Sequence, residues 1–462
     1  MQKTSATKKY WVAKFGGTSV ATHAAMARCV SVVMNHPDVR VIVVSAPSGV
    51  TDLLVKLSQS NQLELDIKPL VNEIKTKIHA IMADITPNQL LPTLRLEIET
   101  MLSDIESFAL TLKNQYSRSD ADALLSYGER LSARLFTCVL QELGLGAAYQ
   151  DARTLIKTNN SFGKAEVLIN ETEKQVNELL LPKCEKSIVV TEGFIGSTLD
   201  NLTTTLGRGG SDYSAAILAE AMRADVLQIW TDVPGIYTVD PRLVTHATPI
   251  DEMSFTEAAE LAQFGAKVLH PATLWPAIRK NIPVFVGSSI NSKAQGTWIR
   301  AKNDERHNAP LIRAISLRRH QSLLTINSLE MLHTHGFLAN IFTILAKHQL
   351  SVDIVTTSEV SVALTLNHPG TGPNDLLTPD ILSELKSISN ISLTIDNELC
   401  LIALVGNQLH ITSGISGKVF KRLADFNIRL ICHGASSHNL CFLVNEKDAD
   451  AVIQALHAEF FS

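Results

Sequence analysis

Short apolar runs alternate with segments of helical periodicity from Trp11 to Ser289. The runs YWVAKF, VRVIVVSA, SIVVTEGFIG (187–196), VLQIWTDV and IPVFVGSS are rich in β-branched residues, which is typical of buried strands. Helical segments such as 213–222 and 254–264 lie between them. This alternation predicts an α/β fold in which helices sandwich a mainly parallel sheet and ligands bind at the carboxyl ends of the strands.

Residues 53–145 interrupt this alternation with a long helical pattern. Apolar side chains recur there at helical spacing, at Ile98, Met101, Leu102, Ile105, Phe108 and Leu112. The pattern is too short for a coiled coil. We therefore expect a helical insertion in the α/β domain.

Composition excludes several classes of protein. The chain has 462 residues, of which 45% are hydrophobic and 19% charged, as expected of a globular protein with about two to four domains. Its net charge of −5, with dispersed Lys and Arg, gives no basic face for nucleic acid, and no segment reads as a membrane span. The six cysteines form no CxxC pair and no signal-peptide pattern opens the chain, so we expect reduced thiols and a cytoplasmic protein.

From about residue 311 the pattern becomes shorter and repeats. Residues 336–366 align without gaps on 414–444, so that Gly336 matches Gly414 and Phe342 matches Phe420. Each copy predicts a helix followed by two strands. With the flanking segments, each predicts a small β-α-β-β-α-β module, over 311–393 and 396–462, with 311–320 as a strand that the second module could share. Two copies are too few for a solenoid and favour a paired regulatory unit.

Glycine and charged residues gather at the predicted strand ends. The clusters are KFGGTS (14–19), SAPSGVTDLL (45–54), YGERLSA (127–133), TEGFIG with GRGGSD (191–212) and TDVPGIYTVDPR (231–242). In GRGGSD, Gly207, Gly209 and Gly210 permit close approach of the backbone to a ligand, and a helix expected from about Tyr213 would present free N–H groups. Together these clusters predict a site that handles phosphate. The alternative for GRGGSD is an ordinary turn with Asp212 as the helix N-cap.

Two common nucleotide-binding signatures are missing. The chain has no G-x-x-x-x-G-K-[ST], since GISGKVF at 414 fails the spacing, and no G-x-G-x-x-G follows the first strand. A P-loop fold and a dinucleotide dehydrogenase are therefore not expected.

Four motifs together resemble one family. KFGGTSV, TLGRGGSDY, WTDVPGIYTVDPR and FGAKVLHPAT are similar to those of aspartate kinases of the amino-acid-kinase family, most closely the monofunctional, lysine-inhibited form, and the tail repeats resemble tandem ACT modules. The resemblance implies an amino-acid-kinase αβα sandwich over 1–300, followed by two ferredoxin-like ACT modules. It also implies the reaction of ATP with L-aspartate to give ADP and 4-phospho-L-aspartate, with Mg²⁺, as the first step of lysine, threonine and methionine biosynthesis. L-Lysine would be the inhibitor and the ACT modules would form a homodimer, with a tetramer left open.

The resemblance assigns the catalytic pair to Lys14 and Asp212. Lys14 matches the lysine that neutralises charge on the transferring phosphoryl group, and Asp212 matches the acid that orients this lysine and supports Mg²⁺. The alternatives are a solvated lysine at a strand edge and a simple N-cap. The direct ligands of the metal stay unassigned.

The substrate site implied by the resemblance centres on Arg208 and Glu129. The guanidinium fork of Arg208 would clamp the α-carboxylate of aspartate, and Glu129 would hold its ammonium, with Thr51, Phe194 and Ser211 around them. The alternative for Glu129 is a surface pair with Arg130.

For ATP, the family's contact segments match Lys14, Gly16, Gly17, Thr18, Ser19, Thr231, Asp232, Tyr237, Arg242, Lys267 and Val268. Tyr237 and Val268 would face adenine, whereas Arg242 and Lys267 would face phosphate. Simple packing is the alternative for Tyr237 and Val268.

The two repeats differ in charge. The first carries Asp353 and Glu359 where the second has Ile431 and Ser437, so only the first can neutralise a cationic amino acid in this way. The residues matching the family's lysine site are Met331, Thr334, Phe337, Leu338, Ser351, Val352, Asp353, Ser358, Glu359 and Val360. Thr334 stands where close relatives have serine. The alternative is that both acids are loop charges.

Two other functions stay open from sequence. One is another amino-acid kinase, acting on glutamate or acetylglutamate, which would not be expected to carry the Glu129 motif or the tandem tail. The other is a lysine-sensing ACT protein without catalysis, against which Lys14, Arg208 and Asp212 argue.

Overall fold

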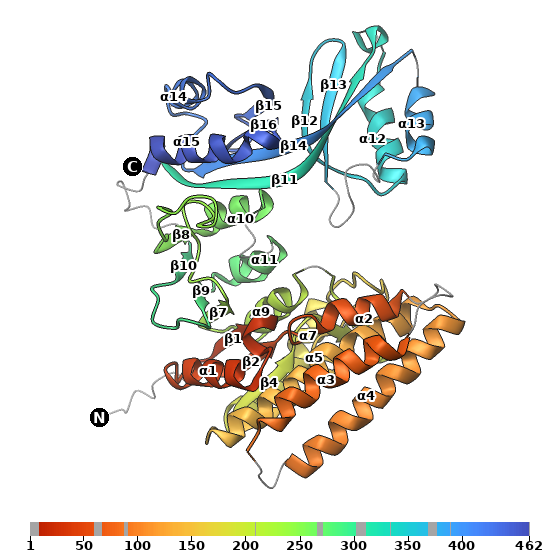
Figure 1. The fold of residues 1–462 in the computed structure, drawn as a ribbon, viewed down its shortest axis with the longest axis vertical. Coiled ribbons are helices and arrows are strands. Elements are labelled where there is room, and N and C mark those ends of the chain that lie inside the picture. The colour runs from red at the N-terminus through yellow and green to blue at the C-terminus, as the bar shows by residue number, and fades with distance from the viewer. Residues whose placement is uncertain are drawn as a thin grey trace. The chain divides into compact units, whose positions relative to one another are not determined.

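The computed structural model describes residues 9–59, 67–86, 91–207, 209–265, 271–301, 311–332, 334–367, 377–388 and 390–461. The chain forms two compact units (Figure 1). We call the unit of Met1–Ile236, Pro249–Phe255 and Lys267–Asn303 the N-terminal unit, and that of Tyr237–Thr248, Thr256–Ala266 and Asp304–Ser462 the C-terminal unit. Two segments inside the predicted kinase domain, 237–248 and 256–266, thus belong to the C-terminal unit.

An eight-stranded sheet in the order β3-β4-β2-β1-β7-β9-β10-β8 forms the centre of the N-terminal unit. All its neighbouring strands run parallel except β9 and β10, which confirms the mainly parallel sheet. The strands are β1 (Trp11–Phe15), β2 (Val39–Val44), β3 (Ala147–Tyr149), β4 (Ile188–Glu192), β7 (Val226–Thr231), β8 (Glu252–Ser254), β9 (Val284–Ser288) and β10 (Thr297–Arg300). The carboxyl ends of the parallel central strands therefore meet at one edge.

Helices cover this sheet because their apolar faces match it. In one buried cluster, Phe15, Val44 and Val190 from three strands pack with Leu131 and Phe136 of α5. The helices of the unit are α1 (His23–Met34), α2 (Val50–Ser58), α3 (Ile67–Ala83), α4 (Leu91–Asn114), α5 (Arg118–Glu142), α6 (Ala152–Leu155), α7 (Ile169–Gln175), α8 (Leu181–Cys184), α9 (Gly210–Ala221) and α11 (Pro271–Lys280). Figure 1 shows α3, α4 and α5 side by side, so the described parts of 53–145 are largely helical.

Two sequence expectations about segment boundaries were wrong. The run 187–196 is not one strand: β4 ends at Glu192, Phe194 has a φ of 68°, and β5 (Ile195–Ser197) pairs instead with β6 (Thr203–Thr205). The helix expected from Tyr213 starts at Gly210, after Gly209 with a φ of 70°. Both departures follow from left-handed backbone in the turns after strands, at Phe194 and Gly209, which local propensity does not reveal.

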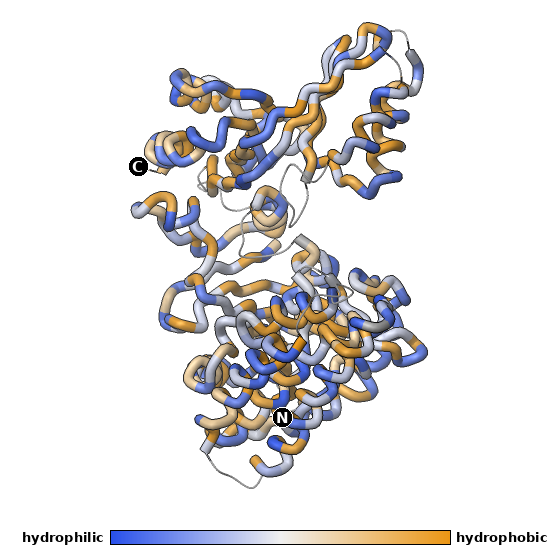
Figure 2. Tube along the Cα trace, turned by 45° about the vertical axis from the view of Figure 1, so that its right-hand side comes forward, coloured by the Kyte–Doolittle hydropathy of each residue, from blue (hydrophilic) through white to orange (hydrophobic). Residues whose placement is uncertain are grey.

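The C-terminal unit is built on one antiparallel six-stranded sheet in the order β12-β13-β11-β14-β16-β15. Figure 2 shows hydrophobic and hydrophilic residues interspersed along its strands and helices, as expected of one-sided burial. The strands are β11 (Ile312–Asn327), β12 (Ser351–Thr357), β13 (Ser361–Asn367), β14 (Ser392–Gly406), β15 (Ile428–His433) and β16 (Asn439–Asn445). The helices are α10 (Phe255–Gln263), α12 (Phe337–Lys347), α13 (Pro379–Lys386), α14 (Ile415–Arg422) and α15 (Ala449–Phe461).

The two repeats share the long strands β11 and β14. Leu324 and Ile326 of β11 pack with α12 and α13, whereas Ile312 and Ile315 pack with α14 and α15. The pairing register of the two strands shifts between Arg318 and Leu323, where His320 and Glu398 both have a φ of 58°. Such bulges reset which side chains face the helices, so each half of a strand serves one repeat.

We expect Gly193→Ala to lower the free energy of unfolding by about 1–3 kcal/mol. A Cβ at Gly193 would lie 2.5 Å from Ser211 Cβ and 2.6 Å from Ser211 Cα, so the start of α9 would have to move. Gly146→Ala is the matched control, since no atom lies within 4 Å of its Cβ, and should change stability by about 0.5 kcal/mol or less. Urea unfolding measures both, and equal stability of the two variants would contradict this packing.

Candidate functional site

A buried ion pair lies at the carboxyl edge of the parallel sheet. Lys14 Nζ, from β1, is 2.6 Å from Asp212 Oδ1 in the first turn of α9. Lys14 is 8% exposed and pairs with Val43 and Ile229 on the two neighbouring strands, so it is not a solvated lysine at a sheet edge. Asp212 is not the N-cap either, because Gly209 holds that position without a side-chain hydrogen bond. The pair therefore joins a central strand to a helix start.

The turn after β1 is pressed against the ends of β2, β7 and β9. Gly16 N donates to Trp230 O (3.1 Å), and the Ser19 and Ser289 hydroxyls are 2.6 Å apart. A Cβ at Gly17 would lie 2.8 Å from Ala46 O, so the close packing requires glycine. Thr18, in the same turn, is exposed. This turn therefore lies at the same edge of the sheet as Lys14.

Glu129 of α5 is buried beside this edge with one oxygen unused. Its Oε1 accepts the Ala46 N–H (3.1 Å), whereas its Oε2 has no hydrogen-bond partner among the described residues. Arg130 does not pair with it and lies over the Tyr127 ring instead, so the surface-pair alternative was wrong. Burial raises the pKa of Glu129 to about 8. A buried carboxylate of this kind requires a proton or a cation.

Sequence analysis missed a second buried acid, Glu192. It is the last residue of β4, fully buried, and accepts hydrogen bonds from Tyr149 Oη (2.5 Å) and Ala152 N (2.8 Å). Burial, with Asp151 nearby, raises its pKa to about 7. The signal was present in the sequence, as an acid directly at the end of an apolar run in TEGFIG.

The other predicted substrate residues are partly described. Phe194 and the first turn of α9 fit tightly, since Phe194 N donates to Ser214 Oγ (2.9 Å) and a Cβ at Gly210 would lie 2.4 Å from Phe194 Cδ2. Ser211 lies in that turn, and Thr51 lies at the start of α2; both are partly buried. Arg208 lies outside the described residues. The structure thus brings Phe194 and Ser211 together at the start of α9.

The predicted nucleotide residues fall into three groups. Thr231 ends β7, donates to Asp232 Oδ1 (3.1 Å) and accepts the Ser289 N–H (2.8 Å). Tyr237 and Arg242 belong to the C-terminal unit, where Arg242 forms an exposed ion pair with Asp240 (2.5 Å). Lys267 and Val268 lie outside the described residues. The structure therefore describes only part of the predicted nucleotide site.

The predicted lysine residues surround α12 and β12. Phe337 is buried, and Met331 and Val352 pack against the same cluster. The more exposed members are Thr334, Leu338, Ser351, Ser358 and Glu359, whereas Val360 is partly buried. Asp353 is paired with Arg318 of β11 (Nη2–Oδ2 2.5 Å), which the sequence did not predict. Asp353 is therefore not a loop charge, whereas the exposed Glu359 fits that description.

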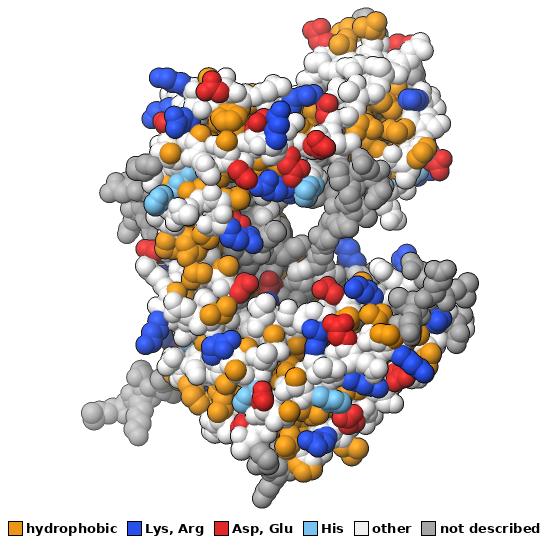
Figure 3. Space-filling view, in the orientation of Figure 1, with side chains coloured by type: hydrophobic (Ala, Val, Ile, Leu, Met, Phe, Trp, Pro, Cys, Tyr) orange, Lys and Arg blue, Asp and Glu red, His pale blue; other side chains and the backbone are white. Residues whose placement is uncertain are grey.

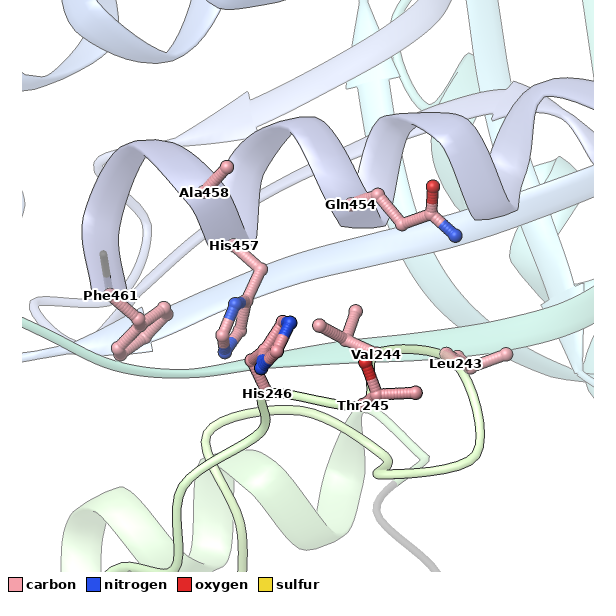
Figure 4. Close-up of a pocket in the computed structure, with 8 residues that line it drawn as sticks. All are labelled: Leu243, Val244, Thr245, His246, Gln454, His457, Ala458 and Phe461. Atoms are coloured by element: carbon pink, nitrogen blue, oxygen red, sulfur yellow. The ribbon is translucent and has the colours of Figure 1, made fainter.

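The C-terminal unit also contains a cavity of about 520 Å³ between α15 and the loop 243–246 (Figure 4). His246 and His457 face it, together with Leu243, Val244, Thr245, Gln454, Ala458 and Phe461. His457 is within 3.1 Å of Thr238 Oγ1 and stacks on Phe461, and burial lowers its pKa. Sequence analysis assigned no role to these residues.

Features typical of other classes are missing from the described part of the chain. Its residues contain no group of three or more His, Cys, Asp or Glu able to hold a metal ion. No described helix is long and apolar enough to cross a membrane. On the face shown in Figure 3, basic and acidic side chains are interspersed over the atoms that are described.

Comparison with known proteins gives two family matches and close full-length relatives. The amino acid kinase family matches residues 9–288, and an ACT domain matches residues 402–460. Lysine-sensitive aspartokinase 3 of Escherichia coli is 49% identical over 97% of this chain and 99% of its own. Chloroplastic aspartokinase 1 of Arabidopsis thaliana is 35% identical over 97% of this chain and 80% of its own.

Two crystal structures of E. coli aspartokinase III resemble this chain along its length. The complex with aspartate and ADP (R-state) has a TM-score of 0.88 at 48% identity, and the complex with lysine and aspartate (T-state) has 0.82 at 47%. Each covers 98% of this chain and 100% of its own. The matches confirm the predicted sandwich with ACT modules.

Because the pKa of Glu129 is about 8 in the folded protein, above the ordinary carboxyl value, this acid should destabilise the fold as pH rises. The contribution of Glu129 to the free energy of unfolding is fully favourable below the ordinary carboxyl pKa and is lost as pH rises through about 8. We expect Glu129→Gln to be more stable relative to wild type at pH 8.5 than at pH 5.5, measured by urea unfolding. Glu178→Gln, at an exposed position, is the control, and a Glu129→Gln difference independent of pH would contradict the account.

Proposed function

The chain belongs to the aspartokinases of the amino acid kinase family, and we propose that it transfers the γ-phosphoryl group of ATP to the side-chain carboxylate of L-aspartate. The products are ADP and 4-phospho-L-aspartate, and the reaction is the first step of lysine, threonine and methionine biosynthesis. The observation that carries the proposal is the Lys14–Asp212 pair at a sheet edge that also holds Glu129, whose Oε2 has no hydrogen-bond partner in the described part of the chain. The aspartate and ADP complex of the 48% identical E. coli enzyme supports both substrates.

Lys14 provides electrostatic stabilisation in this reaction. The reaction brings an anionic carboxylate to an anionic phosphate, and the ammonium of Lys14 neutralises charge on the transferring group. Asp212 holds that ammonium in place at 2.6 Å. The acceptor carboxylate is ionised at neutral pH, so the transfer needs no general base.

The amino acid would be held by its α-ammonium and its α-carboxylate. Glu129 Oε2, which is buried without a partner among the described residues, accepts the α-ammonium. Arg208 clamps the α-carboxylate, and Thr51, Phe194 and Ser211 enclose the rest of the molecule. This polarity favours a free α-amino acid over an N-acetylated one, because acetylation removes the cation that Glu129 requires.

ATP would lie along the turns after β1 and β7. Its contacts are Lys14, Gly16, Gly17, Thr18, Ser19, Thr231, Asp232, Tyr237, Arg242, Lys267 and Val268. Mg²⁺ fits this site: it keeps waters and takes one or two carboxylates plus phosphate oxygens, and the described residues hold no dedicated protein cage. Asp212 is the carboxylate beside the phosphate lysine that would support it, and the ion would neutralise phosphate charge.

L-Lysine would inhibit the enzyme from the first ACT module. We assign the kinase domain to 1–300 and the modules to 311–393 and 396–462, with 311–320 shared. The lysine and aspartate complex of the E. coli relative supports this ligand. Asp353 would attract the cation, and Arg318 is the group with which lysine competes. The cytoplasmic protein would form a homodimer through its ACT modules, with a tetramer as the alternative.

Replacing Lys14 tests the catalytic assignment. Lys14→Ala should lower kcat about 10²–10³-fold, because one contact to the charge of the transition state is lost. Lys186→Ala, at an exposed lysine of the same unit, should leave kcat unchanged. Coupled detection of ADP with aspartate as acceptor measures both, and a near-normal kcat for Lys14→Ala would end the assignment.

Replacing Asp353 tests the regulatory assignment. Asp353→Ala should raise the lysine concentration for half-inhibition at least tenfold and leave uninhibited activity near wild type, because the variant removes the charge that favours the inhibited state. Asp396→Ala is the matched control, since Asp396 pairs with Arg429 (2.5 Å) in the same sheet. Equal inhibition of the Asp353 variant and wild type would place the lysine site elsewhere.

A further inference from the structure

The proposed function leaves the buried acid Glu192 without a role. Its carboxyl group is fully buried at the end of β4 and accepts hydrogen bonds from Tyr149 Oη and Ala152 N. Donors at both oxygens are typical of an ionised or half-protonated acid. The charge of Glu192 therefore needs a separate explanation.

Sheet register places Glu192 beside the substrate acid Glu129. Glu192 pairs with Val44 of β2, and Ala46, two residues further on, donates its N–H to Glu129 Oε1. Val190 lies in the cluster formed with α5, so strand alternation directs Glu192 to the face that α5 covers. Glu129 comes from α5 itself. The two carboxyls therefore converge on the end of β2 from one side of the sheet.

Two of the nearby cations are paired with other acids. Lys14 is paired with Asp212, and Arg153 donates hydrogen bonds to Asp151 through Nε and Nη2. Glu129 Oε2 receives no hydrogen bond within the described residues. The titratable and charged groups that surround the two acids are Lys14, Arg130, Arg134, Tyr149, Asp151, Arg153 and Asp212.

We propose that Glu129 and Glu192 together hold one proton while the amino-acid site is empty, and that the α-ammonium of the substrate displaces it, so that L-aspartate binds with proton release. The proposal rests on the proposed function, and Glu192 acts in it as a positioning residue that keeps Glu129 protonated until the cation arrives. One carboxyl O–H bond breaks, its proton passes to solvent, and an ammonium-to-carboxylate hydrogen bond forms.

The electrostatics agree with this geometry. Burial is the main cause of the raised pKa of both acids, to about 8 for Glu129 and about 7 for Glu192, and Glu192 raises that of Glu129 further whereas Lys14 lowers it. An ammonium against Glu129 Oε2 would act in the same sense as Lys14 and lower its pKa. The pair thus holds a proton near neutral pH only while the site lacks its cation.

Calorimetry of L-aspartate binding to the full chain measures the number of protons released on binding. Binding enthalpies at pH 7 in phosphate, HEPES and Tris should depend on the ionisation enthalpy of the buffer, with a slope of about 0.5–1 proton released per aspartate bound. The release should fall at pH 8.5, where the empty pair has already lost its proton. A slope of zero at both pH values in wild type would overturn the proposal even if no variant folds.

Two variants separate charge from structure at Glu192. Glu192→Gln removes the charge, and its single amide oxygen can accept from Ala152 N while Tyr149 Oη accepts from the amide N–H. Proton release should therefore fall at least twofold, and the acid limb of kcat/KM for aspartate should move to lower pH. The KM for ATP should stay unchanged. Tyr149→Phe removes the hydrogen bond and keeps the charge, and should retain the proton release of wild type.

A merely structural role for Glu192 predicts the opposite pattern. In that case Glu192→Gln would release as many protons as wild type, and Tyr149→Phe would impair both substrates equally. Failure of the proposed function is distinguishable, because aspartate would then give no binding heat and no ADP, whereas failure of this inference alone would leave binding and turnover without a buffer-dependent enthalpy.

Discussion

The ion pair between Lys14 and Asp212 is the contact on which the candidate site depends. It joins a central strand to the first turn of α9, and that turn exists only because Gly209 takes left-handed backbone and Gly193 has no Cβ to collide with Ser211. A lysine that is 8% exposed requires such a partner. The interaction therefore fixes the helix start and the position of the Lys14 charge together.

The negative charge of the site lies on the face of the sheet opposite to that of Lys14. Glu129 and Glu192 come from α5 and β4, on the side of the shared apolar cluster, and meet the lysine only at the carboxyl edge. A ligand with an ammonium at one end and a carboxylate at the other matches this separation. The division of charge follows from a mainly parallel sheet covered by helices on both faces, since its parallel central strands end at one edge.

Sequence predicted the features that repeat along the chain and missed those set by long-range contacts. Alternating apolar runs predicted the mainly parallel sheet, whereas Lys14, Glu129 and Asp212 were named by the resemblance of their motifs to a family, and their roles stay predictions. The prediction that YGERLSA stands at a strand end was wrong, because it lies within α5. The start of α9 was misplaced because its first residue, Gly210, is a poor helix former that tertiary packing positions. The Asp353–Arg318 pair and the bulge at His320 join distant parts of long strands, and no local pattern encodes them.

The most direct test of the proposed phosphoryl transfer is to trap the acyl phosphate with hydroxylamine. Incubation with ATP, Mg²⁺ and hydroxylamine should give aspartyl hydroxamate from L-aspartate, with L-glutamate and N-acetyl-L-glutamate at least a hundredfold less effective. Hydroxamate from aspartate would show phosphoryl transfer to the carboxylate of this substrate. A greater yield from glutamate or N-acetylglutamate, or ADP release without any hydroxamate, would contradict the account.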